Sequence, residues 1–193
     1  MDNRYFTLIN ATMGEILEAV EEAIISYGKM PISYAEVLKI DLYDVHNNPS
    51  VIKYHLWTPA NSKGVACFTN IRDGLPSLIY RIRKKHNFEV VQVCLSVDLP
   101  NCDFRYAMRV FHHWAQDGNE RYVRVMQDPK WDFWEQGERL PFEQVDKYSE
   151  RFIKNRLTND AILDYLMELG WNLRSEDFWA TDETAYCFEW KQW

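Results

Sequence analysis

The sequence lacks the segments that direct a protein to a membrane or hold it there. Its first residues, MDNRYFTLIN, do not combine a basic region with a following apolar region, so no signal peptide is predicted. No apolar run approaches the roughly 18 residues that a membrane-spanning helix needs. We therefore expect a cytoplasmic protein with no membrane partner.

Cysteines are scarce, and no cofactor or catalytic motif is present. The four cysteines form no C-x-x-C pair and have no regular spacing, so we interpret them as reduced thiols: Cys67, Cys94, Cys102 and Cys187. The sequence contains no G-x-G-x-x-G, no Walker-type phosphate loop and no G-x-S-x-G. These absences predict no cofactor and favour a role other than catalysis.

Basic residues are few in the second half of the chain. Residues 1–97 carry ten Lys and Arg and ten Asp and Glu, whereas residues 98–193 carry twelve and nineteen, so this half supplies the net charge of −7. Beyond Leu157 only Arg174 and Lys191 are basic. An acidic surface argues against a nucleic-acid partner, whose phosphates need Lys and Arg, and suits a basic protein partner. The alternative is that the charge only maintains solubility.

One basic cluster stands out against this background. Arg81, Arg83, Lys84 and Lys85 fall at the end of a segment with helical periodicity. Basic residues in the last turn of a helix are usually solvated and interact favourably with its dipole. A phosphate-binding role is the alternative, although no aromatic residues alternate with the basic ones as they do in many nucleic-acid sites.

Periodicity predicts an α+β fold, a mostly antiparallel β-sheet with helices packed on one face, in a single domain covering residues 1–193. Alternating or β-rich runs predict strands, and 38–42 with 52–56 is expected to form a hairpin. The predicted strands are 4–10, 38–42, 52–56, 65–71, 88–97, 104–114, 121–126, 131–135 and 185–190, the last closing the sheet edge. Helices are predicted from a Thr12/Glu15 capping box to Gly28, over 73–85, over 141–157 with Phe152 facing inward, and over 158–169 from a cap at Thr158 or Asn159. An Asp117-Gly118-Asn119 turn is predicted to join strands 104–114 and 121–126.

The residues that could carry chemistry do not form a recognisable site. His112 and His113 are adjacent on a predicted strand, so they point to opposite faces and cannot chelate one ion, and no metal site is predicted. Cys94 or Cys102 with a histidine could form a nucleophile pair, but structural thiols are the commoner case. The carboxylate pairs Asp132/Glu135 and Glu135/Glu138 suit acid–base chemistry, yet acidic turns are common at surfaces. We assign no catalytic residue.

The C-terminal segment combines tryptophans with carboxylates. Rigid aromatic anchors beside charged groups are typical of surfaces that bind a protein of opposite charge. We predict that the partner-binding residues are Glu176, Asp177, Trp179, Asp182 and Glu183. The alternative is that Trp171 and Trp179 fill the core while the carboxylates are merely solvated.

A pattern in 121–171 resembles small cytosolic bacterial proteins of the toxin–immunity kind. In these a strand, a W-x-F…G…L-P-F-E turn and an arginine-bearing helix precede a second helix ending in Leu-Gly. The matching positions here are Arg121–Val125, Trp131–Phe133, Gly137, Leu140–Glu143, Tyr148, Arg151, Arg156 and Leu157. The resemblance implies an inhibitor, without enzymatic activity, of one cognate toxin.

These observations together predict an immunity- or antitoxin-like protein that neutralises a basic bacterial toxin by occlusion. Two alternatives remain open. One is a phage-type inhibitor whose acidic face imitates DNA and displaces a nuclease. The other is an enzyme with an aromatic-lined pocket, in which Glu135, His113 or Cys94 would converge.

Overall fold

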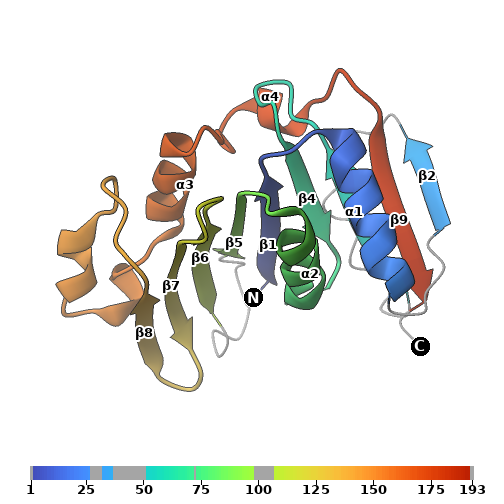
Figure 1. The fold of residues 1–193 in the computed structure, drawn as a ribbon. Helices are drawn as coiled ribbons and strands as arrows, with labels where there is room; N and C mark the ends of the chain where they lie inside the picture. Colours follow the sequence, from blue (N-terminus) through green and yellow to red (C-terminus); the bar gives the residue numbers. More distant parts are fainter. Residues whose placement is uncertain (1, 27–31, 37–50, 72, 98–106, 192–193) are drawn as a thin grey trace.

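The computed structural model describes residues 2–26, 32–36, 51–71, 73–97 and 107–191 (Figure 1). Its strands are β1 (Asp2–Ile9), β2 (Ile32–Glu36), β3 (Val51–Trp57), β4 (Val65–Thr69), β5 (Val90–Val97), β6 (Met108–Trp114), β7 (Glu120–Gln127), β8 (Trp131–Gln136) and β9 (Ala185–Lys191). Its helices are α1 (Met13–Ser26), α2 (Pro76–His86), α3 (Asn159–Glu168), the short α4 (Glu176–Trp179) and the 3₁₀ helices η3 (Val145–Ser149) and η4 (Ile153–Asn155). Within these ranges no helix is long and apolar enough to cross a bilayer.

The strands form one antiparallel sheet in the order β2-β9-β3-β4-β1-β5-β6-β7-β8. Each neighbouring pair is antiparallel, including the meander from β5 to β8. The predicted α+β class with an antiparallel sheet is therefore confirmed. The predicted last strand, however, does not lie at the edge: β9 pairs with both β2 and β3.

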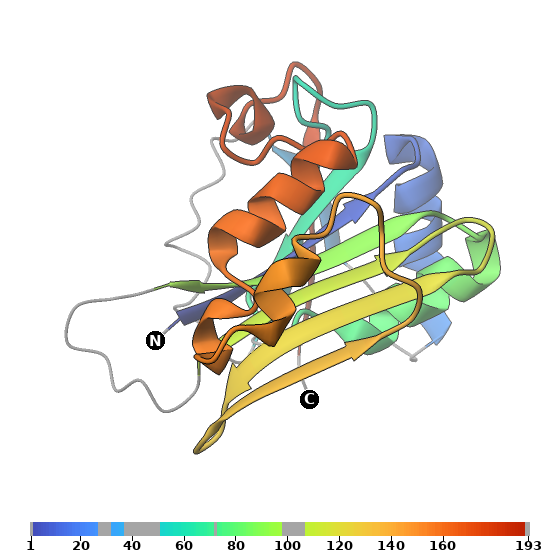
Figure 2. The same ribbon diagram turned by 90° about the vertical axis from the view of Figure 1, so that its left-hand side faces the viewer.

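Helices cover both faces of the sheet, whereas the sequence predicted them on one face. In Figure 2, α1 and α2 lie on one side of the strands and α3 with the 3₁₀ helices on the other. Strand β1 shows the reason. Phe6 and Leu8 belong to the core that contains α3, whereas Ile9, which follows Leu8 and points to the other face, belongs to a second core with α1 and α2. A strand with apolar residues on both faces must be covered twice.

Local signals set most helix ends as expected. In α1, the Thr12 amide donates to Glu15 Oε2 (2.8 Å) and the Glu15 amide donates to Thr12 Oγ1 (3.4 Å), which is the predicted capping box. In α3, the Ala161 amide donates to Thr158 Oγ1 (3.1 Å), and the chain leaves the helix through Gly170 at φ 85°.

The predicted helix over 141–157 is wrong, because only η3 and η4 form there. The backbone is extended at Glu150 and at Phe152, which interrupts any continuous helix. Phe152, predicted to point inward, is 63% exposed. Contacts of Glu143 and Tyr148 with the sheet instead determine the path of the backbone in this segment.

Of the hairpin predicted from 38–42 and 52–56, one strand lies within the described residues. The second strand forms as β3, and residues 38–42 lie outside the described residues. β3 pairs with β4 along one edge and with β9 along the other. The tight turn between β6 and β7 is as predicted: Gly118 has φ 89° and Asp117 Oδ1 accepts a hydrogen bond from the Asn119 amide (2.9 Å).

Candidate functional site

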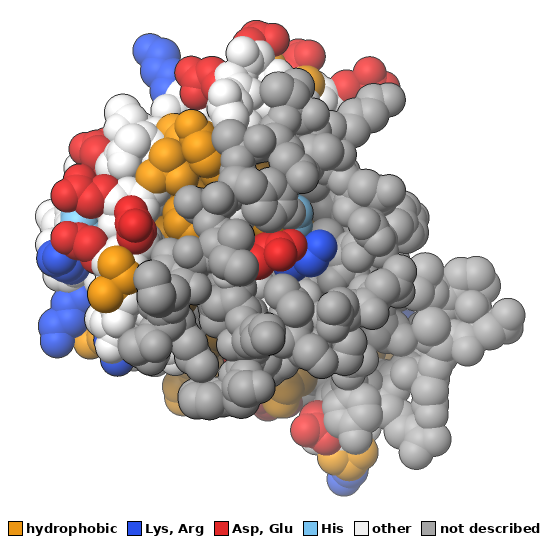
Figure 3. Space-filling model, turned by 90° about the vertical axis from the view of Figure 1, so that its right-hand side faces the viewer, with side chains coloured by type: hydrophobic (Ala, Val, Ile, Leu, Met, Phe, Trp, Pro, Cys, Tyr) orange, Lys and Arg blue, Asp and Glu red, His pale blue; other side chains and the backbone are white. Residues whose placement is uncertain are grey.

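Four exposed carboxylates gather around α4 and the turn that leads into β9. Ser175 caps α4 by accepting a hydrogen bond from the Asp177 amide (3.2 Å), and Thr181 Oγ1 accepts one from the Glu183 amide (3.2 Å). We call the four carboxylates the acidic end: Glu176, Asp177, Asp182 and Glu183. None of them forms an ion pair with another described residue. Figure 3 shows acidic side chains at the top of the molecule, where Figure 1 places α4.

Other acidic residues of the C-terminal segment form ion pairs. Arg174 lies 3.0 Å from Asp164 and 3.5 Å from Asp160, and Lys53 lies 3.3 Å from Glu189. The excess charge predicted for the whole segment therefore lies mainly at the acidic end, with the remainder at the exposed Glu168 and at Asp160 and Asp164, which share the single cation Arg174.

Trp179, the predicted aromatic anchor, is half-buried. Its indole N–H donates to the carbonyl of Leu173 (3.1 Å), and its ring stacks on Trp57 and meets Phe6 edge-on. Trp171 is only 6% exposed. The two tryptophans thus serve mainly to fix the acidic end to the core, and a partner can reach only the outer part of Trp179.

A cleft of about 510 Å³ lies beside the acidic end. One wall is the β3–β4 loop, in which the amide of Ala60 donates to the carbonyls of Asp177 and Ala180 (both 3.0 Å). The other wall is the C-terminal end of α3 with Trp171. Gly64 is required between them, because a Cβ there would lie 2.6 Å from the Trp171 ring. The same loop therefore shapes the cleft and holds α4.

The polar side of the cleft is formed by Glu89, Asn10 and Lys63. Glu89 Oε2 accepts a hydrogen bond from Asn10 Nδ2 (3.2 Å), and Glu89 Oε1 lies 2.9 Å from His113 Nε2. This carboxylate–imidazole pair has the groups of an acid–base dyad. The pair also links the start of β5 to β6, and this structural role is sufficient to explain why the two residues are paired.

The three groups expected to converge in an enzyme site are separated. His113 pairs with Glu89, and Cys94 donates from Sγ to the Met108 carbonyl (3.5 Å). Burial raises the pKa of Cys94 and of Cys67 to about 12, so neither is a thiolate at neutral pH. Glu135 lies in a different cluster on β7 and β8. Cys102 lies outside the described residues.

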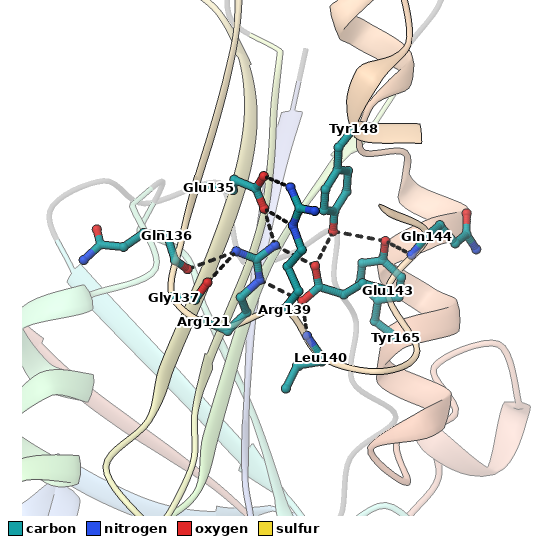
Figure 4. Close-up of polar contacts among 10 residues, drawn as sticks. All are labelled: Arg121, Glu135, Gln136, Gly137, Arg139, Leu140, Glu143, Gln144, Tyr148 and Tyr165. Atoms are coloured by element: carbon teal, nitrogen blue, oxygen red, sulfur yellow. Dashed lines mark hydrogen bonds and ion pairs between the residues drawn. The ribbon is translucent and has the colours of Figure 1, made fainter. Parts of the chain in front are cut away.

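That cluster is a buried ion-pair network centred on Arg121 (Figure 4). The guanidinium donates from Nε and Nη2 to both oxygens of Glu143 (2.7 and 2.6 Å), and Nη2 also donates to Glu135 (2.6 Å). The Tyr148 hydroxyl donates to Glu143 Oε2 (2.7 Å), and the Leu140 amide donates to Glu143 Oε1 (2.9 Å). Burial disfavours the charge of Arg121, but its contacts with Glu143 and Glu135 outweigh this and raise its pKa.

The network explains the pattern that resembles immunity proteins. Arg121, Gly137, Leu140, Glu143 and Tyr148 all contribute to it or to the turn that encloses it. Sequence reasoning missed this pairing, although Arg121 is in phase with Val123 and Val125 and shares their buried face. These five positions of the pattern therefore have a structural role. Glu135, which the carboxylate pairs Asp132/Glu135 and Glu135/Glu138 share, forms ion pairs with Arg121 and Arg139.

The two adjacent histidines point to opposite faces, as predicted. His112 lies 2.6 Å from Glu120 and its ring contacts that of Trp114 at a tilt of 32°, whereas His113 faces Glu89. Burial lowers the pKa of His112 despite its contact with Glu120. Among the residues that the structure describes, no group of three His, Cys, Asp or Glu side chains is arranged to hold a metal ion.

Comparison of the chain with protein-family models, with curated proteins and with solved structures found no match.

Proposed function

We propose that this chain is a protein-binding inhibitor of the immunity or antitoxin type, which neutralises a basic toxin by occluding its active site. The observation that carries the proposal is the acidic end, four exposed carboxylates on a short segment fixed to the core, which form no ion pair with any residue that the structure describes. Unpaired charge on a rigid support attracts a partner of opposite sign at little cost in ordering.

The adjoining cleft supplies the second part of the mechanism. One of its walls, the β3–β4 loop, is hydrogen-bonded to the same segment as the acidic end, so a partner steered by the carboxylates meets the cleft in a fixed position. A protruding loop of the partner, with its apolar part against Trp171 and a polar group near Glu89, fits such a cleft. The acidic end thus sets the association rate, and the cleft sets the lifetime of the complex.

The first test is to purify the tagged chain, at moderate salt, from the organism that encodes it. Recovery of one basic protein in equimolar amount, encoded by a neighbouring gene, supports the proposal. Recovery of the chain alone, while the neighbouring gene is expressed, contradicts it.

The second test measures association with that partner at several salt concentrations. Replacing Asp182 and Glu183 by Lys should slow association about tenfold and flatten its salt dependence. The matched control replaces Asp128 and Glu138, exposed carboxylates elsewhere, by Lys. Equal effects of the two double variants would show that net charge, and not the acidic end, governs binding.

A further inference from the structure

The groove between α1 and α2 has the opposite charge to the rest of the molecule. It encloses about 430 Å³ and lies among the last turns of both helices. Three of its side chains are cationic, Arg81, Lys84 and Lys85, and among the described residues that line it the one carboxylate belongs to Glu22. In a chain of net charge −7, this is a local concentration of positive charge around a hollow.

The helix dipole accounts for part of this arrangement. Cations in the last turn of α2 lie near the negative end of the helix dipole. They stabilise the helix in whichever direction their side chains point. The dipole does not require that the cations of one helix line a hollow closed by a neighbouring helix. It also does not explain why the side chains of Arg81 and Lys85 are held by hydrogen bonds across the groove.

Contacts across the groove hold the donors in place. Arg81 Nη1 donates to Ser26 Oγ (2.7 Å), and Ser26 in turn donates to the Ala23 carbonyl (2.6 Å). Lys85 and His86 both contact Glu22 Oε2, and the His86 ring stacks on Phe88. The hydrogen bond from Lys85 lowers the pKa of Glu22, so this carboxylate stays ionised and offsets only one of the three cations.

We infer that this groove binds a small phosphate-bearing anion. A phosphate offers several acceptor oxygens to the guanidinium of Arg81 and the ammonium groups of Lys84 and Lys85, and it would supply the negative charge that Glu22 alone does not. The hollow is within the size range of small-ligand sites. The site is separate from the acidic end and does not rest on the proposed function.

Isothermal titration with inorganic pyrophosphate at constant ionic strength tests the site. We expect one molecule bound per chain, weakened about tenfold by Arg81→Gln or by Lys84→Gln, which is the loss of one charge-assisted hydrogen bond. Lys130→Gln, the same charge change on the exposed β7–β8 turn, should leave binding unchanged. Glu22→Gln should tighten binding, and more than Glu21→Gln, because Glu21 does not line the groove.

A second arm distinguishes a free phosphate from a lipid headgroup. Phosphatidylcholine vesicles with and without a phosphatidylinositol phosphate are sedimented with the same variants. Binding only to the phosphorylated vesicles, weakened by Arg81→Gln and not by Lys130→Gln, would assign the same site to a headgroup. Absence of binding in both arms, or equal weakening by Arg81→Gln and Lys130→Gln, would overturn the inference.

Discussion

At the scale of single residues, the feature that differs most from the prediction made from the sequence is a buried network of ion pairs. Arg121 and Glu143 are almost completely buried, and each hydrogen-bonding atom of the Glu143 carboxylate has at least one donor. A buried pair adds little net stability compared with apolar residues, but leaving one partner alone is costly. Its role is therefore to specify how the segment after β8 meets the sheet.

Glu143→Gln should lower the free energy of unfolding by about 3–5 kcal/mol, because it leaves the buried Arg121 with only the partly exposed Glu135 as counter-charge. Asp132→Asn, which breaks the surface pair with Arg124, should cost less than about 1 kcal/mol. Urea unfolding measures both. Similar values for the two variants would show that the network is not a structural determinant.

The same network predicts a pH dependence. The hydrogen bond from Arg139 lowers the pKa of Glu135 below its ordinary value of 4.5, although burial acts in the opposite direction. A carboxylate with a lowered folded-state pKa stabilises the fold above its unfolded-state pKa, and this contribution is lost as the pH falls. Glu135→Gln should therefore be less stable than the native chain at pH 7, and the two stability curves should converge below pH 4.5. Parallel curves down to acid pH would contradict this.

At the scale of elements, turns and caps decide where the chain changes direction. The turn after β8 passes through Gly137 at φ 87°, where a Cβ would lie 1.9 Å from the Glu120 carbonyl oxygen. This close approach lets Arg121 reach the carbonyls of Gln136 and Gly137. The glycine therefore connects the hairpin to the ion-pair network.

Gly137→Ala should destabilise the protein by at least about 2 kcal/mol, since the left-handed conformation is strained for alanine and the backbone must also move. Gly14→Ala is the matched control, because Gly14 lies in α1 with no atom within 4 Å of a new Cβ. It should stabilise the protein by up to about 1 kcal/mol. Thermal unfolding of the two variants should shift in opposite directions.

The sequence predicts elements better than it predicts their partners. Capping at Thr12 and Thr158 and the Asp117-Gly118 turn depend on neighbours within four residues, and all three form as expected. The insertion of β9 between β2 and β3 and the pairing of Arg121 with Glu143 depend on contacts far apart in the chain. The same limit applies to the candidate site, where exposed carboxylates were predictable but the packing of Trp179 on Trp57 was not.

At the scale of the whole molecule, one sheet joins two apolar cores. Ile79 of α2 belongs to one core and Leu166 of α3 to the other, and both are fully buried. Strands β1, β4 and β5 lie between the cores and contribute residues to each. Loss of either core would expose one face of these strands, so the two cores should unfold together.

Ile79→Ala and Leu166→Ala test this coupling. Each should lower the global stability by about 2–5 kcal/mol, the usual cost of a large buried truncation. The slowest amides of β5, which lies beside the central strand β1, exchange only on global unfolding. In each variant, the free energy of exchange of these amides should therefore fall by the same amount as the global stability. Exchange in β8, at the sheet edge, should respond less, since an edge strand opens locally. If Ile79→Ala accelerated exchange in α1 and α2 but left β5 and α3 unchanged, the two cores would be separate folding units.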